Sequence, residues 1–229
     1  MSIILSKEEI ARIKETNPLG KGSYANLYKY DDKLIKLFKA PLDSTEKKII
    51  KNLSGEKIDY FVFPDELVRD MFRFLIGYTE EKIEGVTLQK FMALIYHNKY
   101  KDVSFNDLIL LYEILKPSIK EVSKSKITMF DLHDENIMYN GNLNFIDIDL
   151  YYYSKTSFVS SIYKENMNNV GRALIESICK FNEELTCDIE NKIKKYRYSE
   201  DYLERFVNYL DKNYSDVDTL IKYKNKQIK

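Results

Sequence analysis

The sequence predicts an α+β protein with a small β-rich N-terminal lobe and a mainly helical C-terminal lobe. Short β-like runs dominate before Gly85, and apolar residues spaced at the 3.6-residue period of a helix dominate after it. The chain has 229 residues, of which 44% are hydrophobic, and this suits one large domain or two small lobes that share a cleft. We therefore expect residues 1–80 to form the first lobe, 81–85 a hinge and 86–229 the second lobe.

A β-hairpin is expected near the start of the chain. The apolar runs Leu27–Tyr30 and Lys33–Phe38 flank the polar pair Asp31–Asp32, which is typical of a tight turn. A preceding strand is expected to end at Gly20–Gly22. These runs predict three neighbouring strands.

A helix and a further strand follow. Asp43 or Ser44 can cap a helix that continues through Leu53 and ends at Ser54–Gly55. Phe72–Glu81 is rich in β-forming residues, and aromatic or aliphatic side chains alternate with other residues along it, so we expect a strand there. These elements complete the predicted N-terminal lobe.

The second half predicts helices around two short strands. Pro117 is expected to kink the first helix, and Asn140–Gly141 is a good turn between the strands. The expected elements are a helix from an N-cap at Ser104 to Ile119, buried strands at Ile127–Met138 and Leu143–Ile148, a buried helix at Asn166–Phe181, and an amphipathic helix at Tyr202–Leu210.

Charge and composition exclude several classes of protein. Lys+Arg and Asp+Glu both number 36, so no overall charge attracts the chain to nucleic acid or acidic membranes. No apolar stretch reaches the ~20 residues that span a bilayer, and the start of the chain is unlike a signal peptide. Cys179 and Cys187 lie in no motif and are typical of reduced thiols. We expect a cytoplasmic protein with no nucleic-acid or membrane partner.

The N-terminal half holds a candidate phosphate site. Gly20 and Gly22 can let a β-turn close over phosphates, although a plain hairpin turn fits equally well. Lys36 lies in an apolar strand and points away from Ile35 and Leu37, so it is either a solvent-facing lysine or a cation for phosphates. Glu46, near the start of the next helix, is the expected partner that holds the lysine in place.

The segment from Phe130 to Asp147 carries the strongest signal. Phosphoryl transfer needs a base to orient the attacking hydroxyl and oxygen ligands for Mg²⁺. Asp131 can be the base, Asn136 can supply a neutral oxygen, and Asp147 ends an apolar strand where a carboxylate needs a partner or a cation. Together they predict an Mg·ATP site.

The order of these residues resembles the protein kinase-like superfamily. The resemblance covers roughly Leu19 to Phe181. It implies a two-lobed fold with ATP bound between the lobes. The implied nucleotide contacts are the glycine loop with Gly20, Gly22, Ser23 and Leu27, the strand lysine Lys36, the helix glutamate Glu46, and the hinge residues Glu81 and Ile83. The implied catalytic groups are Asp131, Lys36 and His133, with Asn136 and Asp147 as metal ligands.

Departures from typical protein kinases leave the acceptor open. Met129–Phe130 replace the usual His-Arg, and His133 and Asp149 resemble aminoglycoside and choline kinases. The stretch from Gly85 to Asp131, however, leaves room for one long helix and little else, as in protein kinases. We expect a compact protein serine/threonine kinase that acts on a protein substrate. The alternatives are a small-molecule kinase that acts on a hydroxyl-bearing metabolite, and a pseudokinase that binds nucleotide without turnover.

Overall fold

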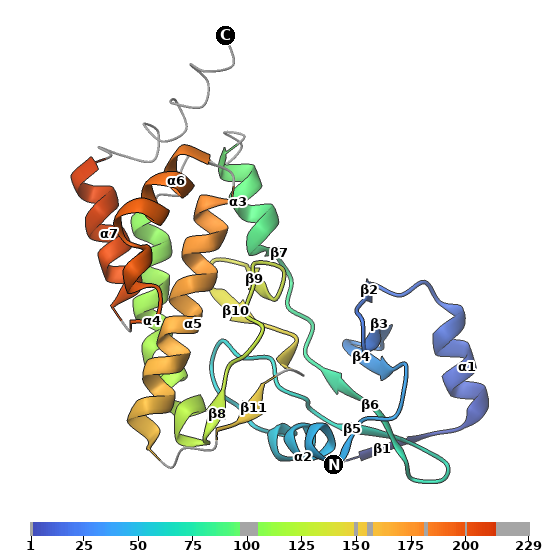
Figure 1. Cartoon of the computed structure of the whole chain (residues 1–229). Coiled ribbons are helices and arrows are strands. Elements are labelled where there is room, and N and C mark those ends of the chain that lie inside the picture. The colour runs from blue at the N-terminus through green and yellow to red at the C-terminus, as the bar shows by residue number, and fades with distance from the viewer. Residues whose placement is uncertain are drawn as a thin grey trace. The chain divides into compact units, whose positions relative to one another are not determined.

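The computed structural model describes residues 2–96, 105–148, 151–154, 158–180, 183–199 and 201–213 (Figure 1). The chain divides into two compact units. Unit 1 comprises Met1–Glu84 and Ile146–Tyr151, and unit 2 comprises Gly85–Phe145 and Tyr152–Lys229. The protein is therefore a mixed α+β structure with one β-rich unit and one mainly helical unit. Residues 146–151, which the sequence places in the second lobe, group with unit 1.

A six-stranded sheet forms the framework of unit 1. Its strands lie in the order β1-β5-β6-β4-β3-β2, and they are antiparallel except for β1, which runs parallel to β5. The strands are β1 (Ser2–Leu5), β2 (Gly20–Lys21), β3 (Ala25–Tyr30), β4 (Lys33–Phe38), β5 (Leu67–Asp70) and β6 (Leu75–Glu80). The predicted hairpin is confirmed as β3 and β4.

Two helices accompany this sheet. Helix α1 (Lys7–Glu15) begins with a capping box between Ser6 and Glu9, and Ile10 and Ile13 pack on a core that includes Ile35 and Leu37. Helix α2 (Ser44–Leu53) has the predicted N-cap, Asp43, and its residues Ile49, Ile50 and Leu53 are buried. Side chains alternate across a strand, so Lys36 points to the face opposite Ile35 and Leu37.

Unit 2 is built on helices that pack side by side, as α4, α5 and α7 do in Figure 1. The helices are α3 (Leu88–Tyr96), α4 (Phe105–Lys124), α5 (Val159–Cys179), α6 (Glu183–Lys192) and α7 (Tyr202–Asn213), with a 3₁₀ turn at Lys194–Tyr196. Small sheets join β7 (Val86–Thr87), β9 (Ile137–Tyr139) and β10 (Leu143–Phe145), and β8 (Ile127–Thr128) with β11 (Tyr152–Tyr153). No helix of the described ranges is long and apolar enough to cross a membrane.

Several expected elements differ in the structure; among them, the strand expected at Leu143–Ile148 ends at Phe145, and the helix expected at Asn166–Phe181 begins at Val159. The strand expected at Phe72–Glu81 begins only at Leu75, because residues 71–74 form the turn of the β5–β6 hairpin. The strand expected at Ile127–Met138 is two strands, β8 and β9, separated by the loop that carries Asp131. Helix α4 continues past Pro117 to Lys124. Its expected N-cap, Ser104, lies outside the described residues.

Candidate functional site

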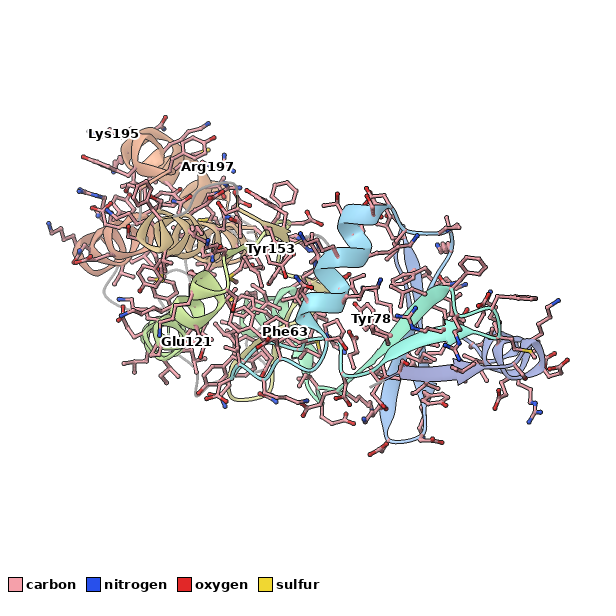
Figure 2. The ribbon with its side chains drawn as sticks, turned by 90° about the horizontal axis from the view of Figure 1, so that it is seen from below. Phe63, Tyr78, Glu121, Tyr153, Lys195 and Arg197 are labelled. Atoms are coloured by element: carbon pink, nitrogen blue, oxygen red, sulfur yellow. The ribbon has the colours of Figure 1, made fainter. Side chains whose placement is uncertain are left out.

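Lys36 occupies a strand in the middle of the unit 1 sheet. It lies opposite Leu27 on β3 and opposite Tyr78 on β6 (Figure 2 labels Tyr78), and only 8% of its surface is exposed. Its Nζ lies 5.8 Å from the centre of the Tyr78 ring. A buried ammonium is costly unless an anion or strong acceptors compensate it, so this position requires a partner.

That partner is Asp147. Lys36 Nζ donates to Asp147 Oδ1 within unit 1, although the two residues are 111 positions apart in the chain. The side chain of Asp147 is 44% exposed while that of Lys36 is 10% exposed, so the carboxylate stands between a buried cation and solvent. The pair brings two of the predicted site residues together.

Glycine at position 77 makes room for Lys36. A Cβ atom at this position would lie 2.1 Å from the carbonyl oxygen of Lys36, too close for any other residue without movement of the backbone. Strands β4 and β6 therefore approach each other closely where the lysine sits. Sequence reasoning missed Gly77; an isolated glycine inside a strand pattern was the available signal.

Asp147 has an unusual backbone and a buried neighbour. Its φ is +58°, in the left-handed region. Tyr151, on the same segment, is 1% exposed, and its hydroxyl has no hydrogen-bond partner among the described residues. Burial, with the charge of Asp147 as a smaller cause, raises the pKa of Tyr151 far above its usual value. The neighbouring Asp149, predicted as an additional acid, lies outside the described residues.

Glu46 has a role at the start of α2. Its carboxylate accepts from the backbone N–H of Asp43 at 2.8 Å, and the Asp43 carboxylate accepts from the N–H of Glu46 at 2.8 Å. This reciprocal capping box stabilises the first turn of the helix. The sequence predicts Glu46 as the partner of Lys36; the structure shows Asp147 bonded to the Lys36 ammonium and the Glu46 carboxylate bonded to the N–H of Asp43.

The glycine loop is a short hairpin between β2 and β3. Gly22 N–H donates to Ala25 O at 3.0 Å, and Lys39 Nζ donates to Gly22 O at 2.6 Å. Gly22 and Ser23 are exposed. Among the described glycines, positive φ values occur elsewhere, so backbone conformation does not require glycine at Gly20 or Gly22.

The expected hinge residues also lie in unit 1. Residues 81–84 connect β6 to the start of unit 2 without regular structure. Glu81 is exposed and Ile83 is half-buried. Their proposed contact with a nucleotide stays a prediction.

In unit 2, the loop between β8 and β9 carries Asp131, His133 and Asn136. Asp131 has a φ of +55°, again in the left-handed region. Asn136 Nδ2 donates to Asp131 O at 3.2 Å, and Asn136 N–H donates to His133 O at 3.0 Å. The side-chain nitrogen of Asn136 is thus engaged, and its Oδ1 is the atom suited to a hard cation.

His133 is oriented within the same loop. Its Nδ1 accepts from the N–H of Glu135 at 3.3 Å, so in the neutral imidazole the proton is on Nε2. This Nε2 lies 3.9 Å from Asp131 Oδ2. The imidazole can therefore present an N–H donor on the side of the loop where the Asp131 carboxylate lies.

Two asparagines of α5 hold the start of this loop. Asn166 is fully buried; its Oδ1 accepts from Met129 N–H at 2.8 Å, and its Nδ2 donates to Ser123 Oγ and Ile127 O, both at 2.9 Å. Asn169 Nδ2 donates to Met129 O at 2.8 Å. These contacts fix the backbone of residues 127–129, directly before the loop, to helix α5.

A groove of about 700 Å³ begins beside the loop in unit 2. Three of its aromatic side chains are exposed at the surface: Phe130 by 56%, Tyr152 by 37% and Tyr198 by 82%. Lys164 and Arg172 of α5 also line it. A second pocket, of about 340 Å³, lies between His133, Asp134 and the end of α5.

The structure thus places the predicted residues in two sets. Lys36, Glu46 and Asp147 belong to unit 1, and Asp131, His133 and Asn136 belong to unit 2. Within the described residues, no group of three His, Cys, Asp or Glu side chains is placed to hold a metal ion. Taken separately, the half-exposed carboxylate of Asp147 in unit 1 and the amide oxygen of Asn136 in unit 2 are oxygen donors of a kind that can bind Mg²⁺. Comparison of the chain with protein-family models and with curated proteins finds no match.

Proposed function

We propose that the protein is a cytoplasmic ATP-dependent phosphotransferase with a protein-kinase-like fold, and that its acceptor is a protein serine or threonine hydroxyl. The observation that carries this proposal is the ion pair between Lys36 and Asp147. The sequence argument assigns both residues independently to a phosphate site, and they meet within unit 1 from opposite halves of the chain.

Backbone strain at the two aspartates adds support. Non-glycine residues with positive φ are uncommon, and they cluster at turns and functional sites. Four of those in the described residues, Asp31, Tyr60, Arg73 and Lys126, lie in turns. The other two are Asp131 and Asp147, the predicted base and metal ligand.

Each residue then has a role in the proposed reaction. Lys36 neutralises the non-transferred phosphates of ATP, and Asp131 orients the acceptor hydroxyl and accepts its proton. The Nε2–H of His133 can donate a hydrogen bond to the transferred phosphoryl group. Asp147 and Asn136 Oδ1 would hold Mg²⁺, which supplies charge neutralisation at the phosphates when bound.

The groove beside Phe130 favours a polypeptide acceptor. It is lined by exposed aromatic rings and by the basic residues Lys164 and Arg172. One of these rings, Phe130, directly precedes the proposed base in the sequence. An extended segment can lie across such a surface with one hydroxyl directed to Asp131. This arrangement is typical of recognition of a chain rather than of a small metabolite.

A small-molecule acceptor is the second candidate. The pocket beside His133 and Asp134 has a volume of about 340 Å³, within the range of ligand pockets. Its acids are already paired, since Asp134 bonds Lys180 at 2.9 Å. A cationic metabolite would have to compete with that lysine, so we rank this function second.

The test is ATP turnover with Mg²⁺, measured for wild type, Asp131→Asn and Asp147→Asn. We expect each substitution to lower turnover by at least about 100-fold. Asp31→Asn is the matched control, because Asp31 also has a positive φ but lies in the β3–β4 turn. Turnover that survives both site substitutions would refute the assignment. Nucleotide binding without any turnover in wild type would indicate a pseudokinase.

The acceptor is identified in the same assay. Phosphate transfer to a panel of proteins is compared with transfer to amines and sugars. We expect labelled protein; labelled metabolite alone would replace the protein-kinase proposal with the second candidate.

A further inference from the structure

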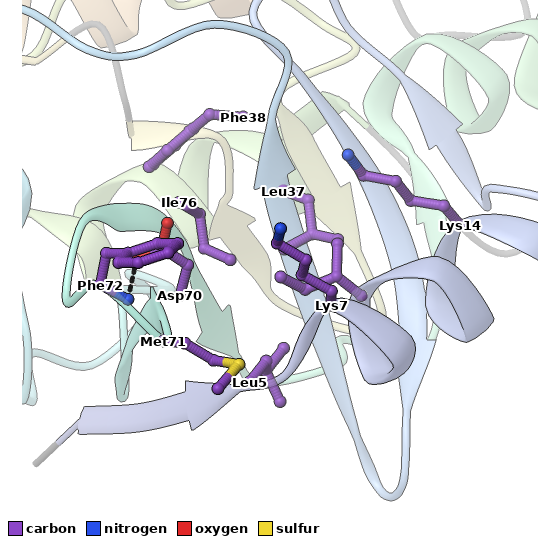
Figure 3. A pocket seen from close by; sticks show the side chains of 10 residues that line it. Leu5, Lys7, Lys14, Leu37, Phe38, Asp70, Met71, Phe72 and Ile76 are labelled. Atoms are coloured by element: carbon purple, nitrogen blue, oxygen red, sulfur yellow. Dashed lines mark hydrogen bonds between the residues drawn. The ribbon is translucent and has the colours of Figure 1, made fainter.

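Unit 1 has an apolar pocket on the side of the sheet that carries α1 (Figure 3). Its volume is about 200 Å³, and it is lined by β1, α1, β4 and the β5–β6 hairpin. Leu5 and Leu37 are buried residues of its lining, and Ile10 and Ile76 pack against the same core. None of the residues of the proposed phosphate site lines this pocket, and Lys36 points to the face of the sheet opposite Leu37.

One wall of the pocket is an exposed apolar turn. Met71 is 63% exposed and Phe72 is 70% exposed, and the adjacent Phe74 is 69% exposed. Turns of this kind usually carry polar residues. Large apolar side chains grouped at the surface mark interaction sites.

The turn is held in a defined conformation. Asp70 Oδ1 accepts from the N–H of Phe72 at 2.9 Å and from the N–H of Phe74 at 2.8 Å. Arg73 N–H donates to Asp70 O at 2.8 Å, and Arg69 Nη1 donates to Arg73 O at 2.9 Å. The backbone of the turn is therefore preorganised, which lowers the entropy cost of binding a partner.

The other wall carries two lysines of α1 that form no ion pair within the described residues. Lys7 and Lys14 lie two turns apart on α1, with Ile10 between them on the same face, and both line the pocket. Both lysines are exposed, and neither forms an ion pair with any residue that the structure describes. The one acid of the lining, Asp70, is engaged in its own turn. Figure 3 shows the lysines on one side and Phe72 on the other.

We propose that this pocket is a docking site for a polypeptide partner that inserts one apolar side chain and places acidic residues against Lys7 and Lys14. Its volume lies below the ~300 Å³ at which pockets for whole small ligands begin, and it suits an anchoring side chain. The two lysines select acidic neighbours around that anchor, because opposite charges steer and align a partner. The proposal does not depend on phosphotransferase activity.

The experiment is selection of displayed random 12-residue peptides on the immobilised full chain, with counter-selection on the Lys7→Glu/Lys14→Glu variant. We expect the recovered peptides to share a large apolar residue within a few positions of at least two acids. Recovered peptides without acids, or no enrichment over the variant, would overturn the proposal.

A recovered peptide is then synthesised and its affinity measured by fluorescence anisotropy. We expect about tenfold weaker binding to Lys7→Glu/Lys14→Glu and to Phe72→Ser, and weaker binding in high salt. Lys48→Glu, which removes an exposed lysine of α2 outside the pocket, should change affinity less than twofold.

Two measurements test whether misfolding of the variants or dimerisation of the chain explains the result instead. The substituted residues are exposed, so circular dichroism should show unchanged folding; Lys14→Gln, a milder change, should still weaken the peptide. Light scattering reports the mass of the chain in solution. A dimer that Lys14→Gln dissociates would show that a second copy occupies the pocket, and the proposed partner would be wrong.

Discussion

Asp131 and Asp147 share a left-handed backbone, with φ values of +55° and +58°. Aspartate tolerates this conformation better than most residues, because its short side chain can bond locally. The conformation still costs free energy, and the rest of the fold must hold it. A substitution at either position therefore changes stability through the backbone conformation, independently of its effect on turnover.

We expect Asp131→Gly to be more stable than Asp131→Ala by about 1 kcal/mol, because alanine is strained at positive φ and glycine is not. Both variants should lose turnover. Asp31→Gly and Asp31→Ala should show the same order of stability with turnover unchanged. Urea unfolding measures the free energies, and equal stability of the two Asp131 variants would contradict the conformational argument.

The pair of Lys36 and Asp147 makes a second prediction. Asp147→Asn, which tolerates the positive φ of this position, leaves a buried ammonium without this charged partner, and we expect the free energy of unfolding to fall by about 1–2 kcal/mol, a value reduced for the exposure of the carboxylate. Lys36→Met in the Asp147→Asn background should recover most of that loss. A double-mutant cycle from urea unfolding checks this; additive effects of the two substitutions would show that the pair contributes no coupling.

At the scale of elements, α5 holds the start of the loop between β8 and β9 through Asn166. Asn166→Ala removes three hydrogen bonds and leaves buried backbone groups of residues 127 and 129 without a partner. We expect a loss of about 2–4 kcal/mol in the free energy of unfolding. Asn169→Ala, which removes one bond from a half-buried side chain, should cost about 1 kcal/mol. Chemical denaturation measures both, and an equal cost would argue against Asn166 as the main anchor.

The ion pair between Lys33 on β4 and Asp65 predicts that the stability of the protein depends on pH. The Lys33 ammonium bonds the Asp65 carboxylate and holds the pKa of that carboxyl below its ordinary value of 3.8. A lowered folded pKa means that the stabilisation is present above pH 3.8 and is lost as the pH falls through the folded value. Asp65→Asn should therefore be less stable than wild type at pH 7, and the difference should shrink below pH 3.8.

Unfolding midpoints in urea, measured from pH 7 down to strongly acid solution, test this prediction. Asp59→Asn is the control, since it changes an exposed acid that is not among the charges acting on Lys33 or Asp65. A stability difference between Asp65→Asn and wild type that stays constant with pH would contradict the assigned cause.

At the scale of the molecule, unit 1 is discontinuous in sequence. It needs residues 146–151, which follow the strand β10 of unit 2. A fragment of residues 1–84 therefore contains Lys36 without Asp147. We expect Lys36→Met to shift the thermal midpoint of the full chain less favourably than that of this fragment, because only the full chain supplies Asp147. An equal shift in both would show that Asp147 contributes nothing to the effect.

Local patterns predicted many of the elements. The turn at Asp31–Asp32, the Asp43 cap, the Asn140–Gly141 turn and the helix beginning at Tyr202 are confirmed, because each is encoded by neighbouring residues. Helix α1 and strands β1 and β5 were not predicted. The capping box of Ser6 and Glu9 was an available local signal for α1, whereas β1 and β5 are short runs that form a sheet only by pairing with each other and with β6.

For the candidate site too, the sequence predicted some features and only the folded structure decided others. The sequence alone identified Lys36, Asp131, Asn136 and Asp147, because a charged or amide group in an apolar context demands a chemical explanation. Tertiary structure alone decided which acid meets the lysine: Glu46 satisfies the helix terminus beside it, and Asp147 reaches the ammonium from a segment far along the chain. A carboxylate can bond either a free N–H or a buried cation, and only the folded backbone determines which of them lies within reach.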